Sequence, residues 1–191
     1  MLVPLLRNLL RLWNELLSFF RLLKPRLFGL RTGAGVCVGS GIEWPLGNVR
    51  NLQLGDRVSL GRRGWFYLPL SHRQARIKIG AGTAIGNDFV ISANQEIQIG
   101  QDCLISYRVS ILDHAHVTGW NIKPTQSGLT QGKPIRIKDG CFIGCGAVIH
   151  AGVELGPNCI VEANSVVMRS FPAGSVLSGS PARLLRLIAN S

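Results

Sequence analysis

The hydrophobic pattern of this chain is most regular between residues 137 and 167. An aliphatic residue recurs there at every sixth position without a slip: Ile137, Ile143, Ile149, Leu155, Val161 and Val167. A small residue follows four places after each of the first five, at Cys141, Ala147, Val153, Cys159 and Ser165. A parallel β-helix has this period, whereas an α-helix or an ordinary hairpin does not. We therefore predict that each hexapeptide forms one short strand and a corner, that both residues point inward, and that three hexapeptides close one coil.

The same period covers the earlier part of the chain, with two interruptions. It begins faintly at Val36, sharpens from Leu54, and lengthens by two residues around Asn94 to Glu96, where polar side chains indicate a widened corner. From Leu112 to Pro134 it is lost over 23 residues, which include the sequence Asp113-His114-Ala115-His116. A long excursion from a rigid repeat is where a solenoid usually places its function. We assign residues 31–172 to the β-helix domain and residues 112–134 to its catalytic loop.

Residues 1–30 have a different pattern, with helical spacing. Polar side chains form one stripe between apolar ones, at Arg7, Asn8, Arg11, Asn14, Glu15, Ser18 and Arg21. Pro25 is expected to end this basic amphipathic helix. The arginines disfavour a transmembrane span, and the lack of a cleavage-site pattern disfavours a signal peptide. Two roles remain open: the apolar face lies in an anionic membrane interface, or it packs on the solenoid or a neighbouring subunit.

After Val167 the repeat ends. Residues 173–191 are assigned to a basic, apolar tail that contains Ser180-Pro181-Ala182-Arg183, and we expect a short terminal helix there.

Composition narrows the class of partner. Lys and Arg total 21 against 10 acidic residues, so the net charge is +11 and the partner should be anionic: a phosphate-bearing cofactor, a membrane surface or nucleic acid. Aromatic residues are only 7% and no nucleic-acid-binding module is recognisable, so we expect no nucleic acid partner. The five cysteines contain no CxxC pair, and Cys103, Cys141 and Cys159 take the inward phase of the repeat. They indicate buried thiols in a reducing cytoplasm.

Several motifs in a fixed order resemble one known family. They are the D-H-x-H sequence at Asp113–His116, P-I-x-I at Pro134–Ile137, the run IG-x2-AVI-x-AGV-x-LG, and G-S-P-A-R at Gly179–Arg183. Together they make the chain similar to the hexapeptide-repeat acyltransferases, in the branch of galactoside, maltose and surface-polysaccharide O-acetyltransferases. The resemblance implies an all-β fold, a left-handed parallel β-helix, and a homotrimer with active sites between subunits. General chirality rules alone would favour right-handed crossovers.

The family's chemistry implies roles for the loop residues. His114 matches its catalytic base, which takes a proton from the acceptor hydroxyl as that oxygen attacks the acetyl carbonyl. Either Asp113 or a backbone carbonyl would fix the tautomer of His114, and a backbone N–H would stabilise the oxyanion. His116, Asn94 and Asp113 are the expected substrate-binding residues, although support for His114 or simple solvent exposure is open for His116.

The resemblance also implies the donor site. Acetyl-CoA is the expected acyl donor, no metal is expected, and the matching positions are Cys145, Ala163, Met168, Arg169, Arg183 and Arg186. The two tail arginines would meet the adenine-phosphate end, which suits a guanidinium. Met168 and Arg169 replace a Thr-Lys pair of the relatives, so the charge is kept and the hydroxyl is lost.

The expected activity is transfer of an acetyl group to a sugar hydroxyl in envelope polysaccharide or lipopolysaccharide synthesis. The acceptor could be lipid-linked, and the enzyme cytoplasmic or peripheral on the inner membrane face. Two alternatives stand beside it. A γ-carbonic-anhydrase-like zinc hydratase would need three converging histidines, but the H-x-H spacing does not match that family. A non-catalytic membrane-associated scaffold would leave the loop histidines and the basic tail unexplained.

Overall fold

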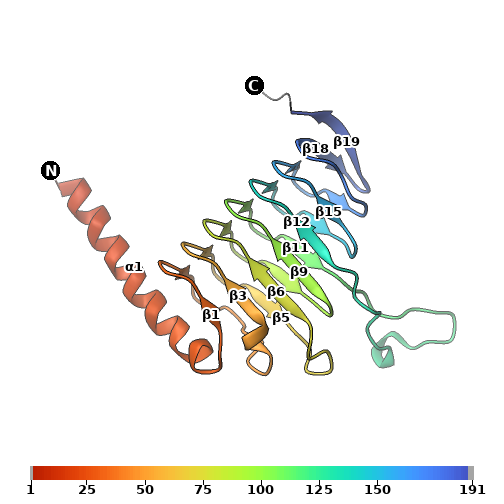
Figure 1. Cartoon of the computed structure of the whole chain (residues 1–191), viewed down its shortest axis with the longest axis horizontal. Coiled ribbons are helices and arrows are strands. Elements are labelled where there is room, and N and C mark those ends of the chain that lie inside the picture. The colour runs from red at the N-terminus through yellow and green to blue at the C-terminus, as the bar shows by residue number, and fades with distance from the viewer. Residues whose placement is uncertain (1, 189–191) are drawn as a thin grey trace.

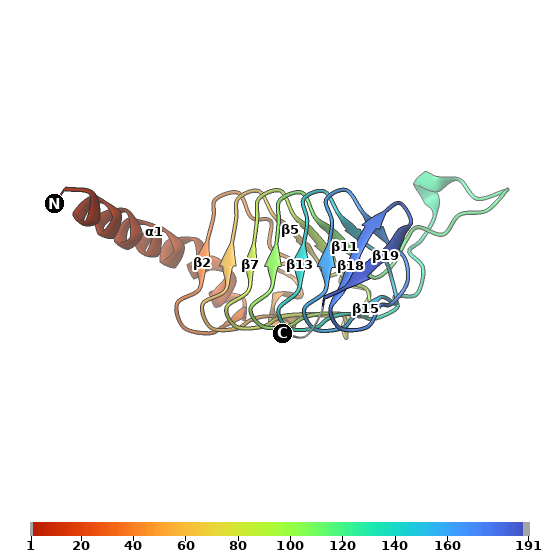
Figure 2. The ribbon, with the colours of Figure 1, turned by 90° about the horizontal axis from the view of Figure 1, so that it is seen from above.

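A computed structural model describes residues 2–188, apart from the side chains of residues 2–12, 14, 15 and 124. One helix, α1 (Leu2–Leu27), precedes a solenoid of short strands whose coils lie side by side (Figures 1 and 2). Three sheets form its walls. The first contains β1 (Arg31–Thr32), β3 (Leu52–Leu54), β6 (Arg76–Ile79), β9 (Glu96–Ile99), β12 (Ile135–Ile137) and β15 (Glu154–Leu155). We call it sheet A.

The other two walls follow the same rule. Sheet B contains β2 (Cys37–Val38), β4 (Ser59–Leu60), β7 (Ala84–Ile85), β10 (Leu104–Ile105), β13 (Phe142–Ile143), β16 (Ile160–Val161), β18 (Ser175–Gly179) and β19 (Ala182–Leu187). Sheet C contains β5 (Trp65–Tyr67), β8 (Val90–Ser92), β11 (Ser110–Leu112), β14 (Val148–Ile149) and β17 (Val166–Val167). Two single 3-10 turns, at Val49–Asn51 and Pro124–Gln126, lie outside the sheets.

The six-residue repeat produces the ladder that the sequence predicts. In the last coils each strand pairs in parallel with the one 18 residues further on, as in Ile137 with Leu155 and Ile143 with Val161. Every aliphatic and every small residue of the predicted inward sets is buried. Since successive coils differ by three hexapeptides, equivalent side chains stack and form one continuous core. The prediction of a parallel solenoid with inward aliphatic ladders is confirmed.

The thiols of Cys103, Cys141 and Cys159 stack in one of these inward columns. Each donates to a carbonyl oxygen of the following coil: to Lys138 at 3.2 Å, Gly156 at 3.2 Å and Pro172 at 3.1 Å. Contact with the thiols on either side, together with burial, raises the pKa of Cys141. All five cysteines are free, so the interior thiols act as small core residues.

Helix α1 covers the open end of sheet B, but with its polar side. Ser18 Oγ accepts a hydrogen bond from the Val38 N–H at 3.1 Å, and the Arg21 guanidinium donates to Val38 O at 2.8 Å. Leu22 is buried beside them, whereas Trp13 and Phe20 are exposed. Val38 belongs to the edge strand β2, whose backbone groups would otherwise be unpaired. The apolar face of the helix therefore does not pack on the solenoid of its own chain.

The helix ends later than the sequence indicated. Pro25 lies inside α1, which continues to Leu27, so the expectation that Pro25 ends the helix is wrong. Gly29 ends it instead, with a φ of 99° that suits glycine, while its N–H donates to Arg26 O. Among the helices of residues 2–188, none is long and apolar enough to cross a membrane.

The expected C-terminal helix is also wrong. The tail forms β18 and β19, an antiparallel pair that turns at Ser180 and Pro181. Val176 and Leu177 of β18 pair with Ile160 and Val161 of β16, so the tail continues sheet B. The backbone groups at the last edge of a solenoid need partners, and a strand supplies them where a helix does not.

The ladder predicts that neighbouring residues of one strand contribute very differently to the free energy of unfolding. Ile77 of β6 is buried and Lys78 is exposed. Replacing Ile77 by Ala should lower the free energy of unfolding by about 2–5 kcal/mol, because the coil cannot collapse around the lost methyl groups. Lys78→Ala, the matched control, should change it by about 0.5 kcal/mol or less. Urea unfolding followed by circular dichroism measures both, and equal losses would contradict the ladder.

Candidate active site

Three widened corners lie at one edge of the solenoid, where sheet C passes to sheet A. They are residues 68–75, 93–95 and 113–134, which follow β5, β8 and β11. The last residues of these strands pair with one another, Tyr67 with Ser92 and Ser92 with Leu112. The chain thus leaves the ladder at the same point in three successive coils. Residues far apart in sequence meet there for that reason.

The Asp113 carboxylate joins two of these corners. It accepts hydrogen bonds from the backbone N–H groups of Asn94 at 2.7 Å, Gln95 at 2.8 Å and Glu96 at 2.9 Å. Its own carbonyl accepts from the Lys133 N–H at 2.8 Å, which closes the long loop at its base. The Asp113 side chain is 0% exposed. The two extra residues of the Asn94 corner therefore serve to present three N–H groups to one carboxylate.

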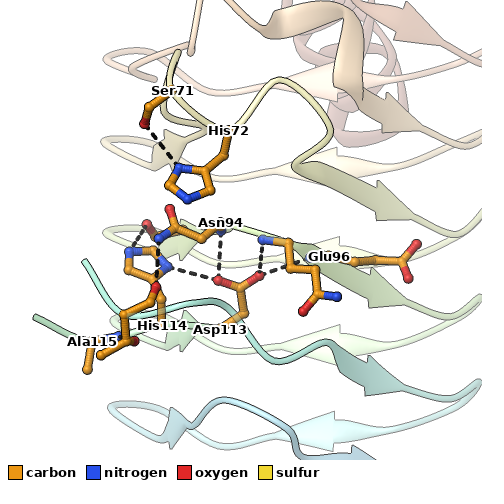
Figure 3. A network of polar contacts seen from close by, with 10 residues as sticks. Ser71, His72, Asn94, Glu96, Asp113, His114 and Ala115 are labelled. Carbon is orange, nitrogen blue, oxygen red and sulfur yellow. Dashed lines mark hydrogen bonds and ion pairs between the residues drawn. The ribbon is translucent and has the colours of Figure 1, made fainter. Parts of the chain in front are cut away.

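The same carboxylate orients His114. The Nδ1 atom lies 2.8 Å from Asp113 Oδ1 (Figure 3). An ionised carboxylate only accepts hydrogen bonds, so Nδ1 carries the proton and Nε2 is the basic nitrogen. Ser92 Oγ lies 3.4 Å from Nε2. The sequence left open whether Asp113 or a backbone carbonyl fixes the tautomer of His114. In the structure the Asp113 carboxylate occupies that position.

Asp113 itself was expected among the substrate-binding residues, and the structure corrects that expectation. Its carboxylate is wholly buried and is engaged by three N–H groups and an imidazole. A group without exposed surface cannot touch an acceptor. Asp113 is a positioning residue behind His114.

A cavity of about 650 Å³ opens in front of His114. Aromatic side chains of β5 form one wall, Trp65 and Tyr67, with ring centroids 5.4 Å apart. The long loop forms another wall with His116 and Leu129, which face each other in an antiparallel bridge. His150, from the end of β14, completes it. His114 is only 7% exposed, so it reaches the cavity with a small part of its ring.

Asn94 lies between two imidazoles, those of His72 and His114 (Figure 3). It is 4% exposed, and its Nδ2 donates to Thr130 O at 3.2 Å. Its Oδ1 is buried and has no hydrogen-bond partner within the described chain. Asn94 also lines a second cavity of about 460 Å³, shared with His72, Arg73 and Gln131. A buried acceptor without a donor is costly, so Asn94 is held in a strained polar environment at this corner.

The charge beside the corner is largely neutralised. Arg76 Nε donates to Glu96 Oε1 at 2.5 Å, and Gln98 Nε2 donates to the same oxygen at 2.7 Å. The hydrogen bond from Arg76 lowers the pKa of Glu96, which therefore stays ionised at neutral pH. A second guanidinium, that of Arg136, lies 3.6 Å from Glu96 Oε2. Both arginines therefore hold Glu96 at the corner.

Sequence reasoning missed four groups that border the histidines: Trp65, Tyr67, Ser92 and His150. Ser92 could have been found from the register, because Ile91 aligns with Ile111 and the next residues must then pair. Trp65 and Tyr67 follow by the same argument one coil earlier. Thr130 was also missed: its Oγ1 accepts from the Ala115 N–H at 3.0 Å. The six-residue period cannot predict where the residues of the long loop lie, because they are outside the repeat.

Three histidines, His114, His116 and His150, line the same cavity. Within residues 2–188, however, no group of three or more His, Cys, Asp or Glu side chains is arranged so that it could hold a metal ion.

Comparisons with known proteins show which family the chain resembles. Residues 134–169 match the family model described as bacterial transferase hexapeptide, with six repeats. Galactoside O-acetyltransferase of Escherichia coli is 27% identical over 132 residues, which cover 69% of this chain and 64% of that protein. The chain is therefore similar to acetyltransferases of the hexapeptide-repeat family.

Two further relatives of the family are similar over a large part of this chain. A candidate lipopolysaccharide-biosynthesis O-acetyltransferase of Escherichia coli is 31% identical over 109 residues, 52% of this chain and 55% of that protein. The structure of a hexapeptide-repeat acetyltransferase of Vibrio cholerae, complexed with acetyl coenzyme A, superposes with a TM-score of 0.61 and 26% identity, covering 87% of this chain and 75% of that one. The chain spans about half the length of the first curated relatives it matches, 44% to 57%.

The six residues that the family resemblance assigns to the donor are exposed or half-buried, but they lie on different parts of the solenoid. Cys145 and Ala163 occupy successive corners between sheets B and C. Met168 and Arg169 follow β17 at the edge between sheets C and A, and Arg169 lies over the Phe171 ring at 5.1 Å. Arg183 and Arg186 are on β19. None of the six lines the cavity beside His114.

Loss of the Asp113 carboxylate should destabilise the fold as well as the site. Asp113→Ala leaves three N–H groups without an acceptor, two of them buried (Asn94 and Glu96), and we expect a loss of about 3 kcal/mol in the free energy of unfolding. The matched control is Asp139→Ala, whose exposed carboxylate accepts one backbone hydrogen bond, from Gln101 at 2.8 Å. Asp139→Ala should lower the free energy of unfolding by only a small fraction of the loss expected for Asp113→Ala. Denaturant titration decides, and similar losses for the two variants would show that the buried network contributes no special stability.

Proposed function

We propose that this protein transfers an acetyl group from acetyl-CoA to a hydroxyl group of a sugar, with His114 as the general base. The observation that carries the proposal is the hydrogen bond of His114 Nδ1 to the buried Asp113 carboxylate, which leaves Nε2 basic beside an open cavity. A base held in one tautomer needs no rearrangement before it accepts a proton. The family relatives supply the acyl chemistry.

The reaction would proceed in one displacement. His114 Nε2 takes the proton of the acceptor hydroxyl while its oxygen forms a bond to the thioester carbonyl carbon. The tetrahedral intermediate then collapses, the carbon–sulfur bond breaks, and the departing thiolate takes the proton back from the imidazolium. Asp113 stabilises that imidazolium by its charge and keeps the ring in place.

Features of the cavity support a sugar as the acceptor. Trp65 and Tyr67 offer an aromatic wall that suits the apolar face of a pyranose ring. His116, on the loop 113–134, is exposed at the same cavity and can donate a hydrogen bond to a ring hydroxyl or accept one from it. The relative named for lipopolysaccharide biosynthesis supports a glycan of the cell envelope as the acceptor, and the one named for galactoside acetylation supports a sugar.

We further propose a homotrimer in which the donor lies between subunits. Cys145 and Ala163 lie at the corners that lead into strands of sheet C, and Met168 and Arg169 lie at the corner that follows its last strand. A cofactor in a cleft between two subunits would meet one edge of each. The loop 113–134 also projects from the solenoid (Figure 2) and carries Trp120 fully exposed, as expected of a segment that contacts a neighbour.

Replacing the base tests the mechanism. His114→Ala should lower kcat by about 10²–10⁴-fold with acetyl-CoA and a sugar acceptor, because the proton then has no acceptor at the reacting oxygen. Thiol release measures the rate, with hydroxyl acceptors compared against their amine counterparts. His116→Ala should raise KM more than it lowers kcat. Light scattering should find the same oligomeric mass for all variants, and full activity of the His114 variant would refute the proposal.

Labelling of cysteines tests the donor site independently of turnover. Cys145 and Cys37 are both half-buried free thiols, and only Cys145 belongs to the proposed donor groove. Acetyl-CoA at ten times its Kd should slow alkylation of Cys145 about tenfold, since only the free protein reacts. Cys37 should react at an unchanged rate. Peptide mapping by mass spectrometry measures both, and equal rates at Cys145 with and without acetyl-CoA would place the donor elsewhere.

A further inference from the structure

The exposed face of helix α1 is an apolar surface that the rest of the described chain leaves uncovered. Seven large hydrophobic side chains are exposed on the helix and the residue that follows it: Trp13, Leu16, Phe19, Phe20, Leu23, Leu27 and Phe28. Phe20 is 61% exposed and Leu23 45%. Soluble monomers seldom leave such a contiguous apolar surface in water, so something covers it.

The orientation of the helix is fixed from the other side. Ser18 and Arg21 bind both backbone groups of Val38 at the open end of sheet B, and Leu22 is buried beside them. Turning the apolar face inward would break these bonds and leave the edge strand unpaired. The helix also extends away from the solenoid towards its N-terminus (Figure 2), so a flat surface can reach that face.

The charge of this region favours an anionic partner over a second copy. Residues 1–31 contain six basic residues and one acidic residue, so this segment contributes +5 to the net charge of +11 of the whole chain. Lys24 and Arg26 are exposed at the last turn of the helix, next to Leu23 and Leu27. A second copy would bring its own cationic flank against this one, whereas a layer of anionic headgroups neutralises it.

We propose that the apolar face of α1 docks this protein on an anionic membrane surface, with Trp13, Phe19, Phe20 and Leu23 in the interface and the basic residues at the headgroups. The helix lies along the surface, as amphipathic helices with aromatic and cationic residues do. The proposal is independent of the acetyltransferase activity, because the helix contacts the first coil at β2, whereas the loop leaves the solenoid several coils later, after β11.

Vesicle flotation of the full chain tests it. Vesicles of phosphatidylcholine containing about a third phosphatidylglycerol should bind the protein, and pure phosphatidylcholine vesicles should bind it at least fivefold more weakly. Phe20→Ser with Leu23→Ser should lower binding at least tenfold, because two large apolar side chains no longer enter the interface. The matched control, Leu70→Ser with Leu185→Ser, removes two apolar side chains elsewhere that are at least as exposed, and it should bind as wild type.

Three results would overturn the proposal. They are equal binding to both kinds of vesicle, unchanged binding of the Phe20 and Leu23 double variant, and a change of oligomeric mass in that variant by light scattering. The last would show that the face is a contact between subunits. Lys24→Glu separates charge from packing: it should weaken binding about tenfold to anionic vesicles only, since it replaces attraction by repulsion.

Discussion

Each coil of the solenoid is held to the next by parallel strand pairing in a single register, and every other feature depends on that register. Ile137 pairs with Leu155 and Ile143 with Val161, so an inserted residue within a strand would turn a whole aliphatic column outward. Extra residues are therefore tolerated only at corners. The fold accepts them at one edge in three successive coils, after Tyr67, Ser92 and Leu112. That is how a repetitive protein gathers unlike residues into one place.

The Asp113 carboxylate then connects architecture with chemistry. It compensates its burial through three backbone N–H groups of the Asn94 corner, and the remaining capacity of the same group orients His114. A buried charge that is fully hydrogen-bonded stiffens its surroundings, whereas a partly satisfied one would destabilise them. The hydrogen-bond network of Asp113 thus fixes the position of the basic nitrogen of His114. A substitution of Asp113 therefore changes both the stability of the corner and the orientation of His114.

The sequence predicted those parts of the molecule that follow from local periodicity. The aliphatic and small columns, the widened corner at Asn94 and the loop before Pro134 all appear as expected, because a strict period has one interpretation. Pro25 and the C-terminal tail were misjudged, since the open edges of sheet B decide both ends of the chain. The buried role of Asp113 depends on a coil 20 residues earlier, which no local pattern reveals. The left-handed winding came from the family resemblance alone.

The N-terminal helix shows the same logic at the other end. Two residues of its polar stripe, Ser18 and Arg21, bind the backbone of Val38. A solenoid ends in unpaired N–H and C=O groups, and polar side chains satisfy them better than leucines do. Once the polar side is committed to capping, the apolar side must face outward. The exposure of Trp13 and Phe20 is therefore a consequence of closing the solenoid, and it leaves the chain with a surface that only a further partner can cover.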